Sequence, residues 1–239
     1  MTAESVPGGP PAESAAVFPT RIIDALGRDI VDGVLAPGER LTIEGLQQRF
    51  GVSRTVVRDC MRVLEAMQLI VPRRRVGIVV QGPERWNVYD RRVIRWRLEG
   101  PGRADQYRSL TQLRRAVEPV AASLAASAAS PGQRERLVAL AADLRRLGEA
   151  GALLEFLEVD IAFHDLVLEA SGNEMFLALR EVIAEVLSGR TRQGLMPRRP
   201  EEHALRTHEQ VAAAVRDGDG PRAESCMASL LAEVSSAID

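Results

Sequence analysis

Residues 30–70 read IVDGVLAPGERLTIEGLQQRFGVSRTVVRDCMRVLEAMQLI, and this stretch decides the fold of the first third of the chain. One amphipathic helical pattern stops before Pro37, and two further short helical patterns follow, separated by Gly51. Thr42 and Ser53 precede these two patterns as N-caps, because Ser and Thr oxygens accept hydrogen bonds from the free N–H groups of a first helical turn. The stretch therefore predicts a helix–turn–helix.

The residues on either side complete a small domain. A helix is expected to start at Thr20, and it places Ile22, Leu26 and Ile30 on one face. After residue 68, two β-prone runs joined by an arginine-rich turn at residues 72–75 predict a two-stranded wing. We therefore expect three helices and a two-stranded wing over residues 20–82, preceded by a Pro-rich disordered tail at residues 1–19.

The remainder of the chain has only helical patterns. Residues 83–105, which contain the run WNVYDRRVIRWRLEG, predict a basic linker helix whose two tryptophans, Trp86 and Trp96, dock between domains. Residues 106–239 predict an all-α antiparallel helical bundle, because long helical patterns are joined by short breaks. The expected helices cover residues 106–129, 131–150, 153–171, 174–194, 200–217 and 220–238. The fold class is thus mainly α.

Composition excludes several classes of protein. The chain has 239 residues, 46% of them hydrophobic, and a formal net charge of −2. No apolar run approaches the ~20 residues of a membrane-spanning helix, so no membrane partner is expected. Two distant cysteines, Cys60 and Cys226, and an N-terminus without signal-peptide features favour free thiols in a reducing cytoplasm. A basic N-terminal third followed by an acidic remainder is typical of a polyanion-binding module joined to another domain.

The first candidate site is the start of the helix that follows Gly51. Ser53, Arg54, Thr55 and Arg58 lie in its first turns, where a helix–turn–helix presents side chains to the major groove. Arginine can bridge the O6 and N7 atoms of guanine, and hydroxyl groups suit phosphate oxygens. A solvated helix face would explain the same residues taken alone, but the preceding helix and the arginine-rich wing favour DNA binding.

The run from PGERL to GVSRTVVR, residues 37–58, resembles the winged helix–turn–helix of GntR-family bacterial transcription regulators. The layout of residues 20–237 resembles the FadR-type subfamily, which carries an FCD ligand-binding domain. The chain departs from the usual pattern with Val56 in place of Pro and with Asp-Cys-Met at residues 59–61 in place of Glu-Ala-Leu. The resemblance implies contact with operator DNA by Arg54, Thr55 and Arg58, and approach of the wing to the minor groove at Gly77. The full set of predicted DNA-binding residues is Arg40, Ser53, Arg54, Thr55, Arg58, Arg74, Arg75 and Gly77.

The second candidate site lies in DIAFHDLVLEASGN, residues 160–173. Asp160 and His164 are four residues apart, so both project from one face of a helix, and that face also carries Leu168. A buried carboxylate and imidazole need partners. A divalent metal shared between them is one solution, and a mutual hydrogen bond is the other.

The FCD resemblance implies a metal site at the floor of an effector cavity. It adds His208 to Asp160 and His164 and places the fourth family ligand at Leu230, which cannot coordinate. One divalent metal per chain, Zn or Ni, could still bind to the three ligands if water or an effector carboxylate completes the coordination. The missing imidazole should weaken that binding. Asn173 is a further expected effector-binding residue, and His203 is expected on the surface.

A third candidate is Arg114, in SLTQLRRAVEPVAASLAA. It shares an apolar helix face with Leu110 and Val117, and Glu118 follows one turn later. The pair could be an ordinary intrahelical ion pair, or Arg114 could clamp a carboxylate with its planar guanidinium group. The arrangement resembles the FCD helix whose arginine binds acidic effectors. Arg190 and Arg192 are further cavity candidates, although surface positions near a helix end are expected for them.

These observations predict a dimeric regulator that binds palindromic operator DNA and responds to a small carboxylate effector. The linker also resembles FCD regulators of sugar-acid catabolism, which favours a hydroxylated carboxylate and a repressor. Two other interpretations remain at this point. One is a metal-dependent enzyme that uses Asp160, His164 and His208, although no general base or nucleophile accompanies them. The other is an assembly scaffold that binds no ligand.

Overall fold

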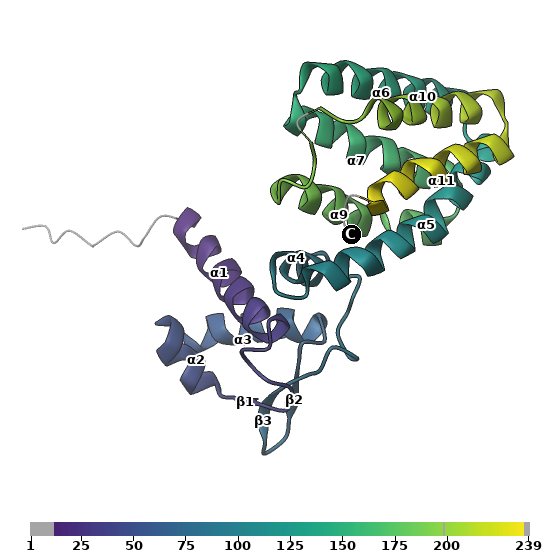
Figure 1. The fold of residues 1–239 in the computed structure, drawn as a ribbon. Helices are drawn as coiled ribbons and strands as arrows, with labels where there is room; N and C mark the ends of the chain where they lie inside the picture. Colours follow the sequence, from purple (N-terminus) through teal and green to yellow (C-terminus); the bar gives the residue numbers. More distant parts are fainter. Residues whose placement is uncertain (1–11, 198, 237–239) are drawn as a thin grey trace, which may run out of the picture. The chain divides into compact units, whose positions relative to one another are not determined.

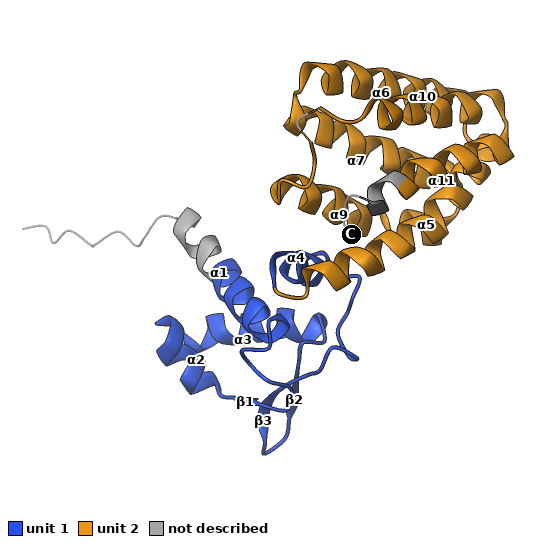
Figure 2. Cartoon of the chain, in the orientation of Figure 1, with its two compact units in different colours: residues 1–100 blue, residues 101–239 orange. Residues whose placement is uncertain are grey.

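The structure is a computed structural model that describes residues 12–197 and 199–236, with side chains over residues 19–197 and 199–232 (Figure 1). The chain divides into two compact units, residues 1–100 and residues 101–239 (Figure 2). Both units are mainly helical, and the small antiparallel sheet lies in the first. The predicted fold class, a winged helix–turn–helix followed by a helical bundle, is confirmed.

The helix–turn–helix forms for the reasons that the sequence indicates. The Oγ1 atom of Thr42 accepts a hydrogen bond from the backbone N–H of Gly45 at 3.0 Å, which caps the first helix of the pair. That helix ends at Gly51, which has the left-handed φ of 66° that glycine adopts without steric cost. Ser53 then caps the second helix by accepting from the N–H of Val56. The elements of this unit are α1 (Ala12–Val31), β1 (Arg40–Leu41), α2 (Ile43–Phe50), α3 (Arg54–Ala66), β2 (Ile70–Arg73), β3 (Gly77–Val80) and α4 (Arg91–Glu99).

The wing has three strands, whereas the sequence predicts two. The strand order is β1-β3-β2, with both pairs antiparallel and with Arg40 opposite Val79 in the β1–β3 pair. β1 contains only two residues, too few for an alternation of polar and apolar side chains to be recognised in the sequence. The third strand attaches Arg40, one of the predicted DNA-binding residues, directly to the wing.

Helix α1 begins before the predicted start. It covers Ala12–Val31 and passes through Pro19, so the prediction of a disordered tail at residues 1–19 is wrong for residues 12–19. The run AESAA has high helix propensity, which outweighs the Pro-rich composition on which the prediction rested. Residues 1–11, the rest of the predicted tail, lie outside the described residues.

Both tryptophans belong to the core of the N-terminal unit. Trp86 and Trp96 are buried there, and Trp96 donates a hydrogen bond from its indole Nε1 to Asp24 of α1 at 3.2 Å. The expectation that they dock between domains is therefore wrong, because α4 packs on α1 through an apolar face. The helices meet at Gly27, where an added Cβ would lie 2.2 Å from the ring of Trp96.

Replacing Gly27 with alanine is expected to destabilise the N-terminal unit by about 1–3 kcal/mol, because the added methyl group overpacks a buried and immobile ring. Alanine normally stabilises a helix relative to glycine, so a loss of stability would report the contact with Trp96. Urea unfolding followed by tryptophan fluorescence measures the change. The control is Gly132→Ala in α6 (Pro131–Ala150), where no atom would meet the new Cβ within 4 Å. Equal stability of the two variants would contradict the expected clash.

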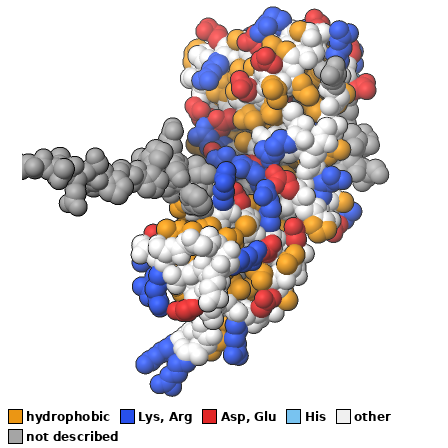
Figure 3. Space-filling view, turned by 90° about the vertical axis from the view of Figure 1, so that its left-hand side faces the viewer, with side chains coloured by type: hydrophobic (Ala, Val, Ile, Leu, Met, Phe, Trp, Pro, Cys, Tyr) orange, Lys and Arg blue, Asp and Glu red, His pale blue; other side chains and the backbone are white. Residues whose placement is uncertain are grey.

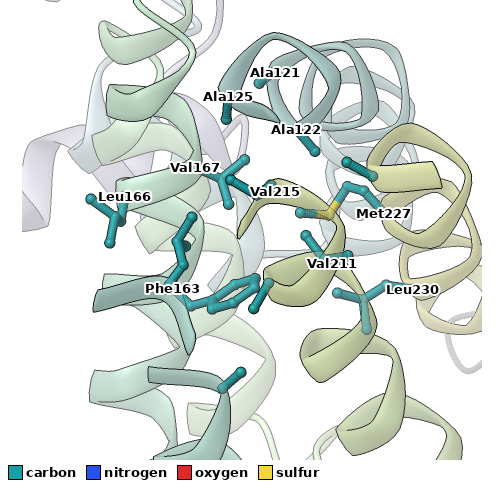
Figure 4. Packing of buried hydrophobic residues seen from close by; sticks show 14 of the residues in the cluster. Ala121, Ala122, Ala125, Phe163, Leu166, Val167, Val211, Val215, Met227 and Leu230 are labelled. Atoms are coloured by element: carbon teal, nitrogen blue, oxygen red, sulfur yellow. The ribbon is translucent and has the colours of Figure 1, made fainter. Parts of the chain in front are cut away.

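The C-terminal unit is a bundle with one alanine-rich core. Helices α5 (Arg103–Ala128), α7 (Leu153–Ala170), α10 (Glu202–Asp217) and α11 (Gly220–Ser236) surround this core, and α6 packs on α7 and α10. Small side chains such as Ala122 and Ala125 let α11 approach α5 closely, while Phe163 and Met227 fill the space between helices (Figure 4). Among the helices of the described residues, none is long and apolar enough to cross a membrane.

The helix expected at residues 174–194 is interrupted. It forms as α8 (Glu174–Leu177) and α9 (Arg180–Arg192), and the N–H of Leu179 bonds to the carbonyl of Phe176, three residues earlier. This tight turn breaks the regular hydrogen-bond ladder without a glycine or proline, so the sequence has no signal for it. The two cysteines, Cys60 and Cys226, are free, as expected.

Candidate functional site

The predicted DNA-binding residues all lie on the exposed surface of the N-terminal unit. Ser53, Arg54, Thr55 and Arg58 occupy the cap and first turns of α3, with their side chains in solvent. The inward face of the same helix is held by Val57, Cys60, Met61 and Leu64, all buried. The burial of one face therefore fixes which side chains of α3 point outward.

Two of these residues have local partners. The hydroxyl oxygen of Ser53 accepts the Val56 N–H, so its first task is to cap α3. Arg54 lies 3.2 Å from the carboxylate of Glu44 on α2, and both side chains are more than half exposed. An exposed ion pair of this kind contributes little to stability, which leaves the Arg54 guanidinium free to exchange partners.

The end of β2 and the turn that follows it carry three consecutive exposed arginines, Arg73, Arg74 and Arg75. Figure 3 shows basic side chains gathered at this end of the molecule. Arg75 has a φ of 62°, and Gly77 has a φ of 103° with the carbonyl oxygen of Leu41 only 3.2 Å from the position of a Cβ. Glycine is thus required at residue 77 by backbone geometry and by the neighbouring strand β1.

A cavity of about 390 Å³ lies within the C-terminal unit. It opens among α5, α7, α9, α10, α11 and the segment that joins α9 to α10. Its charged and titratable lining residues are Arg114, Asp160, His164, Arg190, Glu201 and His208. Its other lining residues are Phe156, Leu187, Leu195, Met196, Pro197, Pro200, Ala204, Leu230 and Leu231. The structure therefore brings together four of the five predicted effector-binding residues.

Arg114, Glu118 and His164 form a buried network at one side of this cavity. The Nε atom of Arg114 donates to Oε1 of Glu118 at 2.5 Å, and its Nη2 lies 3.4 Å from Nε2 of His164. The other oxygen of Glu118 contacts Nδ1 of His164. All three side chains are almost fully buried. The Arg114–Glu118 pair that the sequence left open as an exposed helix pair is thus a buried one.

The second histidine is held in a similar way. His208 places Nδ1 2.8 Å from the carbonyl oxygen of Ala204, and its Nε2 lies 3.2 Å from Oδ1 of Asp160. The Nε2 atom of His164 lies 3.6 Å from the same Asp160 oxygen. The ring of Phe163 meets both imidazoles edge-on, which restricts their rotation.

The two buried carboxylates are ionised at neutral pH. Burial by itself raises the pKa of Glu118, but Arg114 and His164 outweigh burial and lower this pKa to about 2. Burial also raises the pKa of Asp160, whereas the hydrogen bond with His208 and the neighbouring charges lower it to about 2. Asp160 is therefore a carboxylate and can act as a ligand.

The hydrogen-bond geometry of the histidines fits a cation. The Ala204 carbonyl beside Nδ1 of His208, and the Glu118 carboxylate beside Nδ1 of His164, would each favour the tautomer with the proton on Nδ1. With the proton on Nδ1, each Nε2 would direct a lone pair toward Asp160, and a bound cation would then replace the hydrogen bond between His208 and Asp160. One possible ligand atom from each of Asp160, His164 and His208 lies within 4.8 Å of the other two, close enough for all three to bind the same ion. The donor set thus fits one divalent metal.

One nitrogen of Arg114 has no hydrogen-bond partner among the described residues. Nη1 is buried and makes no hydrogen bond within the described part of the chain, although Nε and Nη2 of the same group are engaged. An unpaired buried donor costs stability, so this N–H group fits an acceptor supplied by a bound molecule. Because Arg114 lines the cavity beside the metal-binding residues, a carboxylate there can meet both.

Several sequence-based placements need correction. Arg190 lines the cavity with only 8% exposure, so the favoured surface position is wrong and the alternative cavity position is correct, whereas Arg192 is exposed as expected. Asn173 does not line the cavity, because its side chain caps α8 by accepting the N–H of Met175 at 2.9 Å. His203 is exposed on α10, in agreement with the expectation.

The family's fourth-ligand position lies at the cavity. Leu230, on α11, is 4% exposed and is among the lining residues, together with Asp160 and His208. Figure 4 shows its side chain packed among apolar residues of the bundle core. The departure at this residue therefore replaces a polar group of the site with a hydrocarbon side chain.

Glu118 and Phe156 were not assigned to the site from the sequence. Glu118 could have been found, because a glutamate four residues after an arginine on an apolar face implies a buried pair. Phe156, one turn before Asp160, lies on the same side of α7 as the metal-binding residues and forms part of the cavity wall. An aromatic residue on a core-facing helix gives no signal that separates a cavity wall from ordinary packing.

Two families match this chain. Residues 109–233 match the FCD domain, and residues 19–80 match the family described as bacterial regulatory proteins, gntR family. The first match covers the helices that surround the cavity, and the second covers the helix–turn–helix and the wing.

The similarity to known proteins covers most of this chain. The galactonate operon transcriptional repressor of Escherichia coli is 29% identical and aligns with 89% of this chain and 93% of its own length. The uncharacterized HTH-type transcriptional regulator YieP of Escherichia coli is 30% identical, over 69% of this chain and 72% of its own length. Lar of Listeria monocytogenes has a similar solved structure, with a TM-score of 0.61 at 18% identity, over 92% of this chain and 95% of that one.

Proposed function

We propose that this chain, which belongs to the gntR family of bacterial regulatory proteins and carries an FCD domain, is a dimeric repressor controlled by a small carboxylate. It would bind palindromic operator DNA through α3 and the wing. A carboxylate in the cavity would favour one conformation of the protein and so change its affinity for the operator. The unpaired Nη1 of Arg114, buried beside an Asp-His-His cluster, is the observation that carries the effector part of the proposal.

Membership of this family makes the chain a transcription regulator. Its curated relatives are named as transcriptional regulators, so the prediction that it is not an enzyme is confirmed, and the metal-dependent enzyme is rejected. The name of the galactonate operon repressor supports repression as the mode of action here. A repressor of operator DNA works where bacterial DNA lies, which supports a cytoplasmic location.

On the DNA side, we assign base and phosphate contacts to the exposed start of α3. Arg54 and Arg58 project from one side of the helix, where a guanidinium group can bridge O6 and N7 of a guanine. Ser53 and Thr55 suit phosphate oxygens, and the wing arginines would hold the adjacent backbone. Two copies related by a two-fold axis would present two such helices to the two half-sites of a palindrome.

Replacing Arg58 with alanine is expected to weaken operator binding by about 1–3 kcal/mol per subunit, or roughly 5- to 150-fold, because a bidentate contact to a base is lost. Fluorescence anisotropy with DNA selected by the wild-type protein from a random-sequence pool measures the change. The control Arg146→Ala removes the same charge from an exposed site on α6 and should bind operator normally. Normal operator binding by the Arg58→Ala protein would contradict this assignment.

On the effector side, Asp160, His164 and His208 would hold one divalent ion, Zn or Ni, with Nδ1 of each histidine anchored by a second group. The ion would supply an open coordination position for a carboxylate oxygen. Arg114 would donate from Nη1 to the same carboxylate group, so that the metal-binding cluster and the guanidinium hold one anion together. Arg190, which also lines the cavity, adds positive charge that favours an anion.

A further inference from the structure

We call the lining residues Arg114, Asp160, His164 and His208 the floor of the cavity, and its apolar lining residues the walls. Every charged or titratable lining group except Glu201 and Arg190 belongs to the cluster formed by Arg114 and the three metal-binding residues. The walls are formed by six large apolar side chains, Phe156, Leu187, Leu195, Met196, Leu230 and Leu231, together with two prolines and an alanine. A molecule whose carboxylate meets the floor therefore places the rest of its body against hydrocarbon.

Neutral hydrogen-bonding side chains are missing from the lining. Among the described residues, no serine, threonine, tyrosine, asparagine or glutamine lines the cavity. A polyhydroxylated acid would bury several hydroxyl groups there, and each one left without a partner weakens binding by about tenfold or more. Tyr107 and Thr111 lie two turns and one turn before Arg114 on α5, but neither reaches the cavity.

Leu230 further favours a hydrocarbon ligand over a polyhydroxylated one. Leu230 is buried and lies where a fourth polar ligand would otherwise complete the metal site, so a hydrocarbon side chain lines the cavity together with the metal-binding residues. The cavity volume, about 390 Å³, lies within the range of sites for small organic ligands and exceeds the need of a carboxylate group alone. The additional space is bounded by the apolar residues.

We infer that the effector is a carboxylic acid with a hydrocarbon body, aliphatic or aromatic, and not a polyhydroxylated sugar acid. The inference rests on the proposed function, because it takes the acid group to lie between Arg114 and the metal-binding cluster. It replaces the sugar-acid expectation, which depended on the linker and not on the residues that line the cavity.

A homologous series of acids tests this inference. Acetate, butyrate, hexanoate and octanoate are titrated by calorimetry into the full chain saturated with Zn²⁺, with gluconate and galactonate as polyhydroxylated counterparts. Affinity should rise by about fourfold for each methylene group added, until the cavity is filled. Octanoate should bind at least tenfold more tightly than either sugar acid and should lower operator affinity.

Matched variants test whether the apolar wall residues cause the rise in affinity with chain length. Leu195→Ser replaces a partly exposed wall residue and should weaken octanoate binding by about tenfold and acetate binding much less. Leu154→Ser, at a residue that is 70% exposed and does not line the cavity, should change neither. Thr111→Val should also leave octanoate binding unchanged, because Thr111 does not line the cavity.

Two other outcomes distinguish a failure of the hydrocarbon inference from a failure of the proposed carboxylate control. Tighter binding of gluconate or galactonate than of octanoate would overturn the hydrocarbon inference and leave the carboxylate-controlled regulator in place. Binding of none of the acids at millimolar concentration, by a protein that still binds its operator, would overturn the effector assignment together with the inference.

Discussion

The Arg114→Ala variant is expected to lose its response to carboxylates while it still binds operator DNA. Removal of the guanidinium group also leaves the Glu118 carboxylate buried with only His164 as a partner, so the C-terminal unit should be destabilised by roughly 3–5 kcal/mol. Urea unfolding measures the loss of stability, and operator anisotropy with and without the acid measures the response. Arg115→Ala, an adjacent exposed arginine on the same helix, is the control and should behave as wild type.

A second substitution separates the two roles of Arg114. Glu118→Gln in the Arg114→Ala background removes the buried charge, so it should restore a large part of the stability without restoring the response to the acid. If the double variant responds to the acid, Arg114 is a structural residue and not an effector ligand. If Arg114→Ala alone is fully stable, Glu118 must find another partner, and the network described here is incorrect.

The helix–turn–helix could be predicted because its signals are local. Thr42, Gly51 and Ser53 act within one helical turn, and the caps and the left-handed glycine form as the sequence indicates. The strand β1 and the turn after α8 could not be predicted, because a two-residue strand has no periodicity and the turn contains neither glycine nor proline. The placement of Trp96 depends on the packing of α4 against α1 at Gly27, two segments far apart in the chain.

The part of the candidate site that lies on a single helix could be predicted from the spacing of its residues. Asp160 and His164 share a face of α7 by their spacing, whereas His208 entered through a resemblance to a family, since it lies on a different helix. The sequence favours a surface position over a cavity position for Arg190, because residues near a helix end are often exposed, and only the packing of the bundle places it at the cavity. The prediction that Asn173 binds the effector rested on its place in the same motif as Asp160 and His164. Its side chain instead caps α8, a short helix that the sequence did not separate from α9.

The largest expected change in metal affinity is at His208. Its replacement by alanine leaves two of three ligands, and because even groups that only orient a ligand change affinity 10- to 100-fold, we expect a loss of at least about 100-fold. Zn²⁺ and Ni²⁺ titrations against a competing chelator measure the affinity. His203→Ala, an exposed histidine on the same helix, is the control and should keep normal affinity.

Leu230→His tests the same metal site by adding a ligand instead of removing one. Leu230 lines the cavity with the three ligands, so an imidazole there should complete a four-ligand site and tighten metal binding by about tenfold or more. It should also weaken octanoate binding, because a hydrocarbon contact is lost and the metal position open to a carboxylate is filled. Retention of metal by His208→Ala would place the ion elsewhere in the protein. A loss of affinity in His208→Ala, together with no gain in Leu230→His, would mean that α11 lies too far from the ion for a side chain at residue 230 to coordinate it.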